Sequence, residues 1–431
     1  MFLIFVIAAT AITLTLYFGM QEETRIVLPK KGTPVSSDGT VKKTASLILW
    51  AVAGNADADK IRNRIPGWET ALNAKISLRL FASRTDFESA RIITARNREA
   101  PDVFPVSAAD AESLDKSGAL QRLPLASIDA SQWVPQTLAP FQRGDNALLA
   151  YPAQYSLTLL YYNKAEFDRV GIAYPDDQWN WDSLLDVAKA LYKPSVSGRP
   201  PHYGIEVVPT LGLWNAFSLQ LGAPVYNNRQ WNLGSAEGDS IQKEALQFLI
   251  DIYQKYTFAA PTPQGGKPLF FLRGQSAMLI GGSELMKAIR SAPDVNWGVT
   301  LLPAKYAMEP DRLRRATPMR LRGWAVNSRT LEEPSLQAAR GLAERLSAIP
   351  LDGWSPARLS GTSDDDGGAS ASPIVLQSLD YAVPPYIGAQ APRIYEIADS
   401  LMGTFSSAST TTGKFLAKIH TLVDDIKPDA K

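Results

Sequence analysis

The stretch Ala150–Phe167, AYPAQYSLTLLYYNKAEF, decides how the chain is divided. Its opening pair, Tyr151-Pro152, is typical of a turn, because the residue before a proline is pushed toward extended geometry. The run Leu157–Tyr162 contains only apolar or β-forming residues, which predicts a buried strand. Asn163 stands where a helix cap belongs, so a helix is expected to follow at once. Since the stretch lies about one third of the way along the chain, we expect this strand to carry the backbone from one lobe into another.

The composition predicts a two-domain protein with a sizeable core. The chain has 431 residues, of which 45% are apolar and 20% charged. A net charge of +1 argues against nucleic acid as a partner. Two histidines, His202 and His420, and no cysteine leave almost no raw material for a zinc site or for thiol or histidine catalysis. We therefore expect neither a metal nor a cofactor.

The N-terminus predicts a membrane segment. Residues 2–20 carry no charge, and a helix of this length spans about 28 Å, close to the thickness of a bilayer core. A secretory signal peptide would need a basic start and a small-residue cleavage site, and Tyr17–Met20 is a poor one. We expect 1–20 to be a hydrophobic signal or anchor segment and the polar residues 21–44 to be a flexible tether. The rest of the chain would then be exported, on the periplasmic or extracellular face, tethered to the cytoplasmic membrane.

The next hundred residues predict alternating strands and helices. Strands are expected at Ala45–Val52, Lys75–Phe81 and Pro101–Val106, and helices at Ile61–Leu72, at Phe87–Arg98 and after Ser107. This order implies a parallel sheet with right-handed crossovers. Ligands bind at the carboxyl ends of such strands. Further on, Asp182 is expected to cap a helix that runs to Leu191, with Trp181 packed at its entry.

Four segments occur in the order and spacing of a known family. They are the strand ending at Trp50, Pro101–Val103 with Ser107, Pro152–Lys164 with Phe167, Gly171 and Trp181, and Phe271–Met278 with Gly281–Ser283. Together they resemble the extracellular solute-binding proteins of ABC importers, the carbohydrate-type family that includes maltose-binding protein. Arg322–Val326 and a C-terminal helical region also match, so the resemblance covers roughly residues 45–427.

The resemblance implies a two-lobed α/β fold of the periplasmic-binding-protein type (type II), with discontinuous lobes and a hinge. The first lobe would comprise 44–153 and 302–350, and the second 154–301 and 351–431. The stretch quoted above would be the first crossover between the lobes, and Asn296–Pro303 the second. The implied function is that of a receptor, not an enzyme, which captures a mono- or oligosaccharide and delivers it to the permease subunits of an ABC transporter.

Sugars present C–H faces and hydroxyl groups, so a site for them needs aromatic rings and polar side chains. Trp50, Trp214 and Trp324 match the stacking aromatics of the family, although each could equally pack in a core. The hydrogen-bonding candidates are Asn55, Ser107, Tyr155 and Ser283. Glu284 is either a solvated carboxylate at a helix start or, if it faces the cleft, a partner for an amine or a hydroxyl cluster.

Alternatives remain at two levels. Tyr161-Tyr162 could suggest ferric iron, but strand alternation places the two rings on opposite faces. Asp364–Gly368 lacks the spaced ligands of a calcium loop. As to function, the chain could be a membrane-tethered glycoside-acting enzyme with two carboxylates, or a degenerate binding fold used as an envelope scaffold.

Overall fold

The computed structural model describes residues 44–431 apart from 95–98, 145, 228, 234–235, 262–267, 294, 307–312, 330–331, 350, 352, 360–371 and 425–431. The expected membrane segment, the tether and the acidic loop at 364–368 therefore lie outside the described residues. Thr44–Lys431 forms one compact unit. Within the described ranges, no helix is both long and apolar enough to cross a bilayer.

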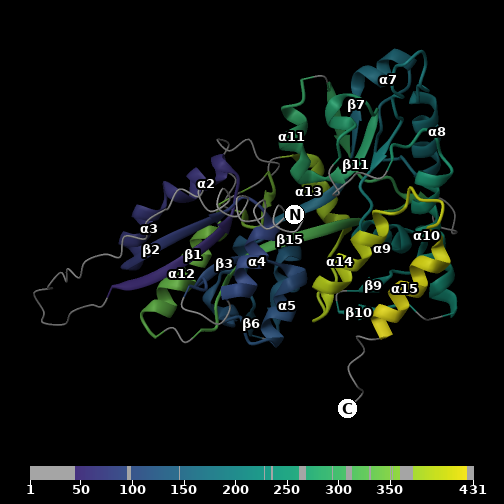
Figure 1. Cartoon of the computed structure of the whole chain (residues 1–431). Coiled ribbons are helices and arrows are strands. Elements are labelled where there is room, and N and C mark those ends of the chain that lie inside the picture. Colours follow the sequence, from purple (N-terminus) through teal and green to yellow (C-terminus); the bar gives the residue numbers. More distant parts are fainter. Residues whose placement is uncertain are drawn as a thin grey trace, which may run out of the picture. The chain divides into compact units, whose positions relative to one another are not determined.

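Three parallel strands begin the fold (Figure 1, purple to blue), as the strand and helix order of the sequence predicted. Strand β1 (Ala45–Val52) pairs in register with β2 (Ala74–Phe81), and it also pairs with β3 (Val103–Ser107). The expected helix over 61–72 is two helices, α2 (Asn55–Arg62) and α3 (Ile65–Leu72). A proline in the first turn of α3 explains the break, because proline starts a helix well but cannot continue one.

Strand β7 (Tyr151–Asn163) is the central element, and it is longer than the run Leu157–Tyr162 predicted. Its first half pairs with β15 (Thr317–Val326), and its second half pairs with β11 (Met278–Gly282) and β12 (Trp297–Thr300). The strand order is β2-β1-β3-β15-β7-β11-β8. The β15 register shifts opposite Pro152, which cannot donate to a ladder.

Two hydrophobic clusters pack on β7. The first holds β1, β3 and helix α12 (Ser335–Ser347), and the second holds helices α9 (Leu211–Leu221) and α10 (Ala236–Gln254). Tyr161 belongs to the first cluster and Tyr162 to the second, so the two rings lie on opposite faces as predicted. The strand therefore contributes to both cores.

Helix starts follow local capping chemistry. Asn163 caps α7 (Lys164–Val170) as predicted, since its Oδ1 accepts from Ala165 N at 3.2 Å. The expectation for Asp182 was wrong: Asn180 caps α8 (Trp181–Leu191) and accepts from the backbone of Asp182, which already lies in the first turn.

The remaining elements complete the chain. They are α4 (Arg84–Thr94), α5 (Ala108–Lys116), β4 (Leu123–Pro124), α6 (Pro135–Leu138), β5 (Gln142–Arg143), β6 (Ala147–Leu148), β8 (Glu206–Val207), β9 (Tyr226–Asn227), β10 (Gln230–Trp231), η5 (Phe271–Arg273), η6 (Ser283–Leu285), α11 (Met286–Arg290), β13 (Lys305–Tyr306), β14 (Leu313–Arg314), β16 (Ser355–Pro356), α13 (Pro373–Ser378), β17 (Ala382–Val383), α14 (Ala391–Met402) and α15 (Thr412–Asp424), with short 3-10 turns between them.

Candidate functional site

The carboxyl ends of strands from both clusters approach β7 and β15 from opposite sides. Strand β3 ends at Ser107, which is paired with Arg322 of β15. Strand β11 ends at Gly282, which is paired with Thr158 of β7, and it continues into Ser283 and Glu284. Because open α/β sheets bind ligands at such ends, this is the place to look for a site. We call it the junction, and define it as Ser107, Ser156, Gly282–Glu284, Arg320, Arg322 and Trp354.

Glu284 is the partly buried carboxylate of the junction. Ser156 donates to its Oε2 and Arg320 Nη2 forms an ion pair with its Oε1. Burial alone would raise the pKa of this carboxyl, but the Arg320 guanidinium and the Ser156 hydroxyl outweigh burial and lower the pKa. A Cβ atom at Gly282 would collide with both the Glu284 carboxylate and Arg320, so glycine is required for this approach.

Arg320 and Arg322 share one indole. They lie two residues apart on β15 and so point to the same face of the strand. The Arg320 guanidinium lies 5.1 Å from the centroid of the Trp354 ring, and that of Arg322 lies 4.1 Å from it. The Arg320 side chain is 53% exposed, whereas Trp354 is buried. The junction therefore presents a solvent-accessible guanidinium on an aromatic base.

Ser107 joins the junction to helix α5. It caps this helix, accepting from Asp110 N at 3.2 Å, and its hydroxyl lies 2.6 Å from Asp110 Oδ2. Arg84 Nη2 lies 2.7 Å from the same carboxylate oxygen. Ser107 is thus held by its own helix, next to Arg322 on the neighbouring strand.

The predicted stacking tryptophans are packed among protein groups. The Trp50 ring meets Phe81 and Phe87, and the Arg79 guanidinium lies 4.9 Å from its centroid. Trp214 lies inside α9, where its Nε1 donates to Gln242 O at 2.8 Å and its ring meets Phe415. Trp324 is buried in β15.

The four predicted hydrogen-bonding residues lie closer to the junction. Ser107 and Ser283 belong to it, and Ser283 Oγ accepts from Leu157 N at 3.2 Å. Tyr155 precedes Ser156 on β7; burial raises the pKa of its phenol to about 12, and Ser355 is its hydrogen-bond partner. Asn55 is the first residue of α2, which begins three residues after the last residue of β1, Val52. It therefore lies at the edge of the sheet where β1 and β3 end.

Sequence reasoning missed Arg320, Arg322 and Trp354 as site residues. One signal was available: in Met319–Trp324, two arginines alternate with apolar residues, which is the pattern of a strand with one charged face. Trp354 carried no such signal, because it lies between short elements and meets β15 only through the tertiary fold. No group of three or more potential metal ligands occurs in the part of the chain that the structure describes.

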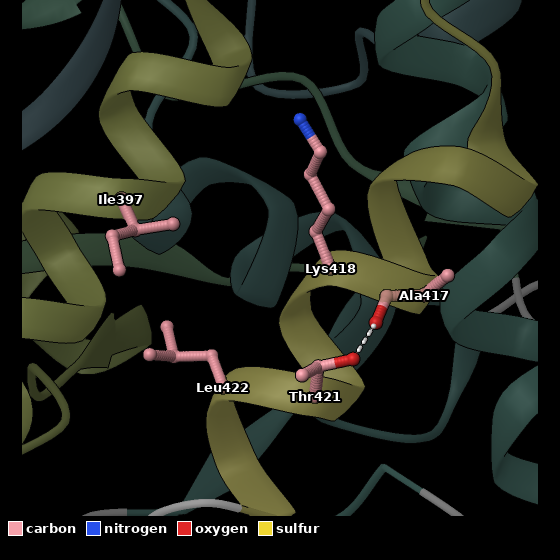
Figure 2. Close-up of a pocket in the computed structure, with 5 residues that line it drawn as sticks. All are labelled: Ile397, Ala417, Lys418, Thr421 and Leu422. Atoms are coloured by element: carbon pink, nitrogen blue, oxygen red, sulfur yellow. Dashed lines mark hydrogen bonds between the residues drawn. The ribbon is translucent and has the colours of Figure 1, made fainter.

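Another carboxylate near Arg320 is Asp399 of α14, an exposed residue whose carboxyl accepts from Leu211 N in the first turn of α9. Local desolvation of the carboxyl raises its pKa to about 6, and the positive charge of Arg320 acts on it in the opposite direction. A surface hollow lies further along the C-terminal helices, between α14 and α15 (Figure 2). Its Thr421 hydroxyl donates back to Ala417 O at 3.0 Å, and none of its lining residues belongs to the junction.

In this fold, β7 contributes to two hydrophobic cores, and the strands β3 and β11 end on either side of the β15–β7 pair, each followed by a helix. This is the architecture of hinged, two-lobed α/β binding proteins. The chain belongs to the bacterial extracellular solute-binding protein family, whose sequence model matches residues 71–347. This confirms the class of protein that the four sequence segments indicated.

Solved structures show the same fold. An ABC substrate-binding protein of Listeria monocytogenes in complex with cycloalternan is 19% identical, with a TM-score of 0.71, and the match covers 89% of this chain and 99% of that one. The maltose-maltodextrin binding protein of Alicyclobacillus acidocaldarius is 16% identical, with a TM-score of 0.67, over 88% and 100% of the two chains. At these identities the likeness establishes the two-lobed fold.

Curated relatives match over a shorter range. The sn-glycerol-3-phosphate-binding periplasmic protein of Rhizobium meliloti is 24% identical over 229 residues, which is 50% of this chain and 52% of the relative. The protein of the same name from Brucella abortus is 26% identical over 198 residues, 45% of this chain and 43% of the relative. The chain thus spans about half the length of the curated relatives it matches.

Proposed function

We propose that this protein is a receptor that captures a small hydroxylated solute at the junction and delivers it to the permease of an ABC transporter. The observation that carries the proposal is the meeting of strand ends from both cores around Ser107, Ser283 and Arg320. The named ligands of similar structures are saccharides, and that of the curated relatives is a phosphorylated polyol. A saccharide or related polyol is therefore the expected class of solute.

The mechanism follows from β7 and β15, which run between the two cores. A solute that contacts both sides binds the closed arrangement more tightly than the open one, and this difference in affinity drives closure. Water is expelled from the site on closure, and the hydrogen bonds that remain are then stronger. The predicted contacts are Asn55, Ser107, Tyr155 and Ser283, with Trp50, Trp214 and Trp324 as the aromatic candidates. Export, with a tether to the cytoplasmic membrane, completes the proposal.

The proposal is tested by thermal unfolding of the full chain with maltotriose, cycloalternan and sn-glycerol 3-phosphate. A solute bound by the folded state alone stabilises it by RT ln(1 + [L]/Kd), which is about 2.7 kcal/mol at one hundred times Kd. We expect Tm to rise with the concentration of at least one solute and the solute to be recovered intact. An unchanged Tm with every solute would contradict the receptor function, and release of a hydrolysis product would favour a glycoside-acting enzyme instead.

A further inference from the structure

The junction offers guanidinium groups where a sugar site would offer ring faces. The guanidinium groups of Arg320 and Arg322 already cover the Trp354 ring. The Trp50 ring is packed among two phenylalanines and Arg79. Guanidinium carries N–H donors and no acceptor, so it matches an acceptor-rich or anionic group better than a hydroxyl that must also donate.

The arginine pair is held in place from two directions. Trp354 lies beneath both side chains, and Glu284 accepts from Nη2 of Arg320. A guanidinium has five N–H donors, and this bond uses one of them. The Arg320 side chain is 53% exposed, so its other donors can be reached from solvent. Such preorganisation lowers the cost of ordering two long side chains around a ligand.

Positive charge is in excess among the groups around the junction. Lys287 Nζ lies 3.7 Å from Asp57 Oδ2, and Lys60 lies 3.4 Å from the other oxygen of the same carboxylate. Among the described groups named around the junction, five cations, Arg84, Arg320, Arg322, Lys287 and Lys60, stand against four carboxylates, Asp110, Glu284, Asp57 and Asp399. The N-terminus of α5, beside Arg322 on the adjacent strand, adds partial positive charge.

We propose that the solute carries a phosphate or carboxylate group, and that Arg320 and Arg322 on the Trp354 ring bind it. This inference rests on the proposed receptor function and names the chemical class of its ligand. Glu284 is a positioning residue: it fixes the plane of the Arg320 guanidinium. The neutral part of the solute then lies toward Ser107, which is beside Arg322 on the neighbouring strand.

The experiment compares matched pairs of probes by calorimetry on the full chain. The pairs are sn-glycerol 3-phosphate with glycerol, and galacturonate with galactose; inorganic phosphate is titrated alone. We expect one charged member to bind at least about tenfold more tightly than its neutral parent, because charge-assisted hydrogen bonds are about twice as strong as neutral ones. Which pair responds distinguishes phosphate from carboxylate.

Variants locate the effect. Arg320→Gln and Arg322→Gln should each weaken binding of the charged probe by about tenfold or more. The affinity of Arg320→Lys should lie between that of these variants and that of the parent protein, because lysine keeps the positive charge but lacks the paired N–H donors of a guanidinium. Arg62→Gln is the matched control, because Arg62 is an exposed arginine paired with Asp59 on α2. Unfolding without probe shows that each variant is folded.

Three results would overturn the inference. Neutral parents that bind as tightly as the charged probes would leave the receptor function standing and remove the charged ligand. If the charged probes bound Arg320→Gln and Arg322→Gln as tightly as the parent protein, the anion would have to bind at another site. If inorganic phosphate bound as tightly as the phosphate ester, the site would bind anions without recognising the solute. Absence of binding by every probe would overturn the receptor function as well.

Discussion

Among single residues, Asp399 makes the pH dependence of stability measurable. The residue is exposed as a whole, but its carboxyl accepts from Leu211 N and is locally desolvated, which raises its pKa from 3.8 to about 6. The folded state therefore binds this proton more tightly than the unfolded state. The stabilisation is fully present below about pH 4 and is lost as the pH rises toward and through 6. Because the residue as a whole is exposed, solvent screening limits this contribution to about 1 kcal/mol or less.

Asp399→Asn should remove this contribution, because an amide does not titrate. Urea unfolding of the parent protein and the variant at several pH values between 4.5 and 7.5 measures the free energy of unfolding. We expect this free energy to change less with pH in the variant than in the parent protein. Asp59→Asn is the control, since Asp59 is exposed on α2. A variant that keeps the parental slope would assign the pH dependence to other groups.

Among elements, helix α5 and the β9–β10 hairpin connect the two cores. Ala108 and Ala111 of α5 belong to the first cluster, whereas Ala109 packs against the second. From the hairpin, Arg229 Nε donates to Glu112 Oε2 and Arg229 Nη2 to Gln142 O, each at 3.0 Å. Under the proposed hinge closure, these contacts would form only when the two cores are close together, so they would favour the closed arrangement.

Arg229→Ala should weaken solute binding a few-fold and leave the fold intact. Glu112 would not be stranded by this change, because Arg143 at 3.5 Å and Lys116 at 3.6 Å also neutralise it. The effect is modest because Arg229 is 42% exposed, and exposed ion pairs contribute about 1 kcal/mol or less. Affinity and Tm are measured together for the parent and the variant.

Arg143→Ala provides the matched control, because Arg143 lies in β5 and pairs with the same carboxylate, that of Glu112 on α5. We expect it to change stability more than affinity. Equal affinity of Arg229→Ala and the parent protein would show that this contact does not bias closure.

The strands and most helices could be predicted because their signals are local. The apolar run of β1, the alternation in β2 and the cap at Asn163 each need only a few neighbouring residues. The site could not, because its geometry depends on residues distant in sequence. Trp214 is buried by Gln242 and Phe415, and the arginines of β15 meet a tryptophan some thirty residues later, which no periodicity reveals.

For the whole molecule, β7 links the folding of the two cores. Its burial is nearly continuous, it pairs with β15, β11 and β12, and its side chains enter both clusters, as Tyr161 and Tyr162 do. If one core unfolded alone, it would strip β7 of ladder partners and expose side chains that both clusters bury. We therefore expect one cooperative unfolding transition, not two.

Leu47→Ala in the first cluster and Leu249→Ala in the second test this coupling. Both side chains are fully buried, so each change should lower the free energy of unfolding by about 2–5 kcal/mol. Hydrogen exchange followed on β1 and on α10 should accelerate in both places for either variant, because one transition exposes both elements. Leu376→Ala is the control, as that leucine is 50% exposed on α13. Acceleration confined to the substituted core would mean that the two cores unfold independently, and that β7 acts as a hinge without coupling their stabilities.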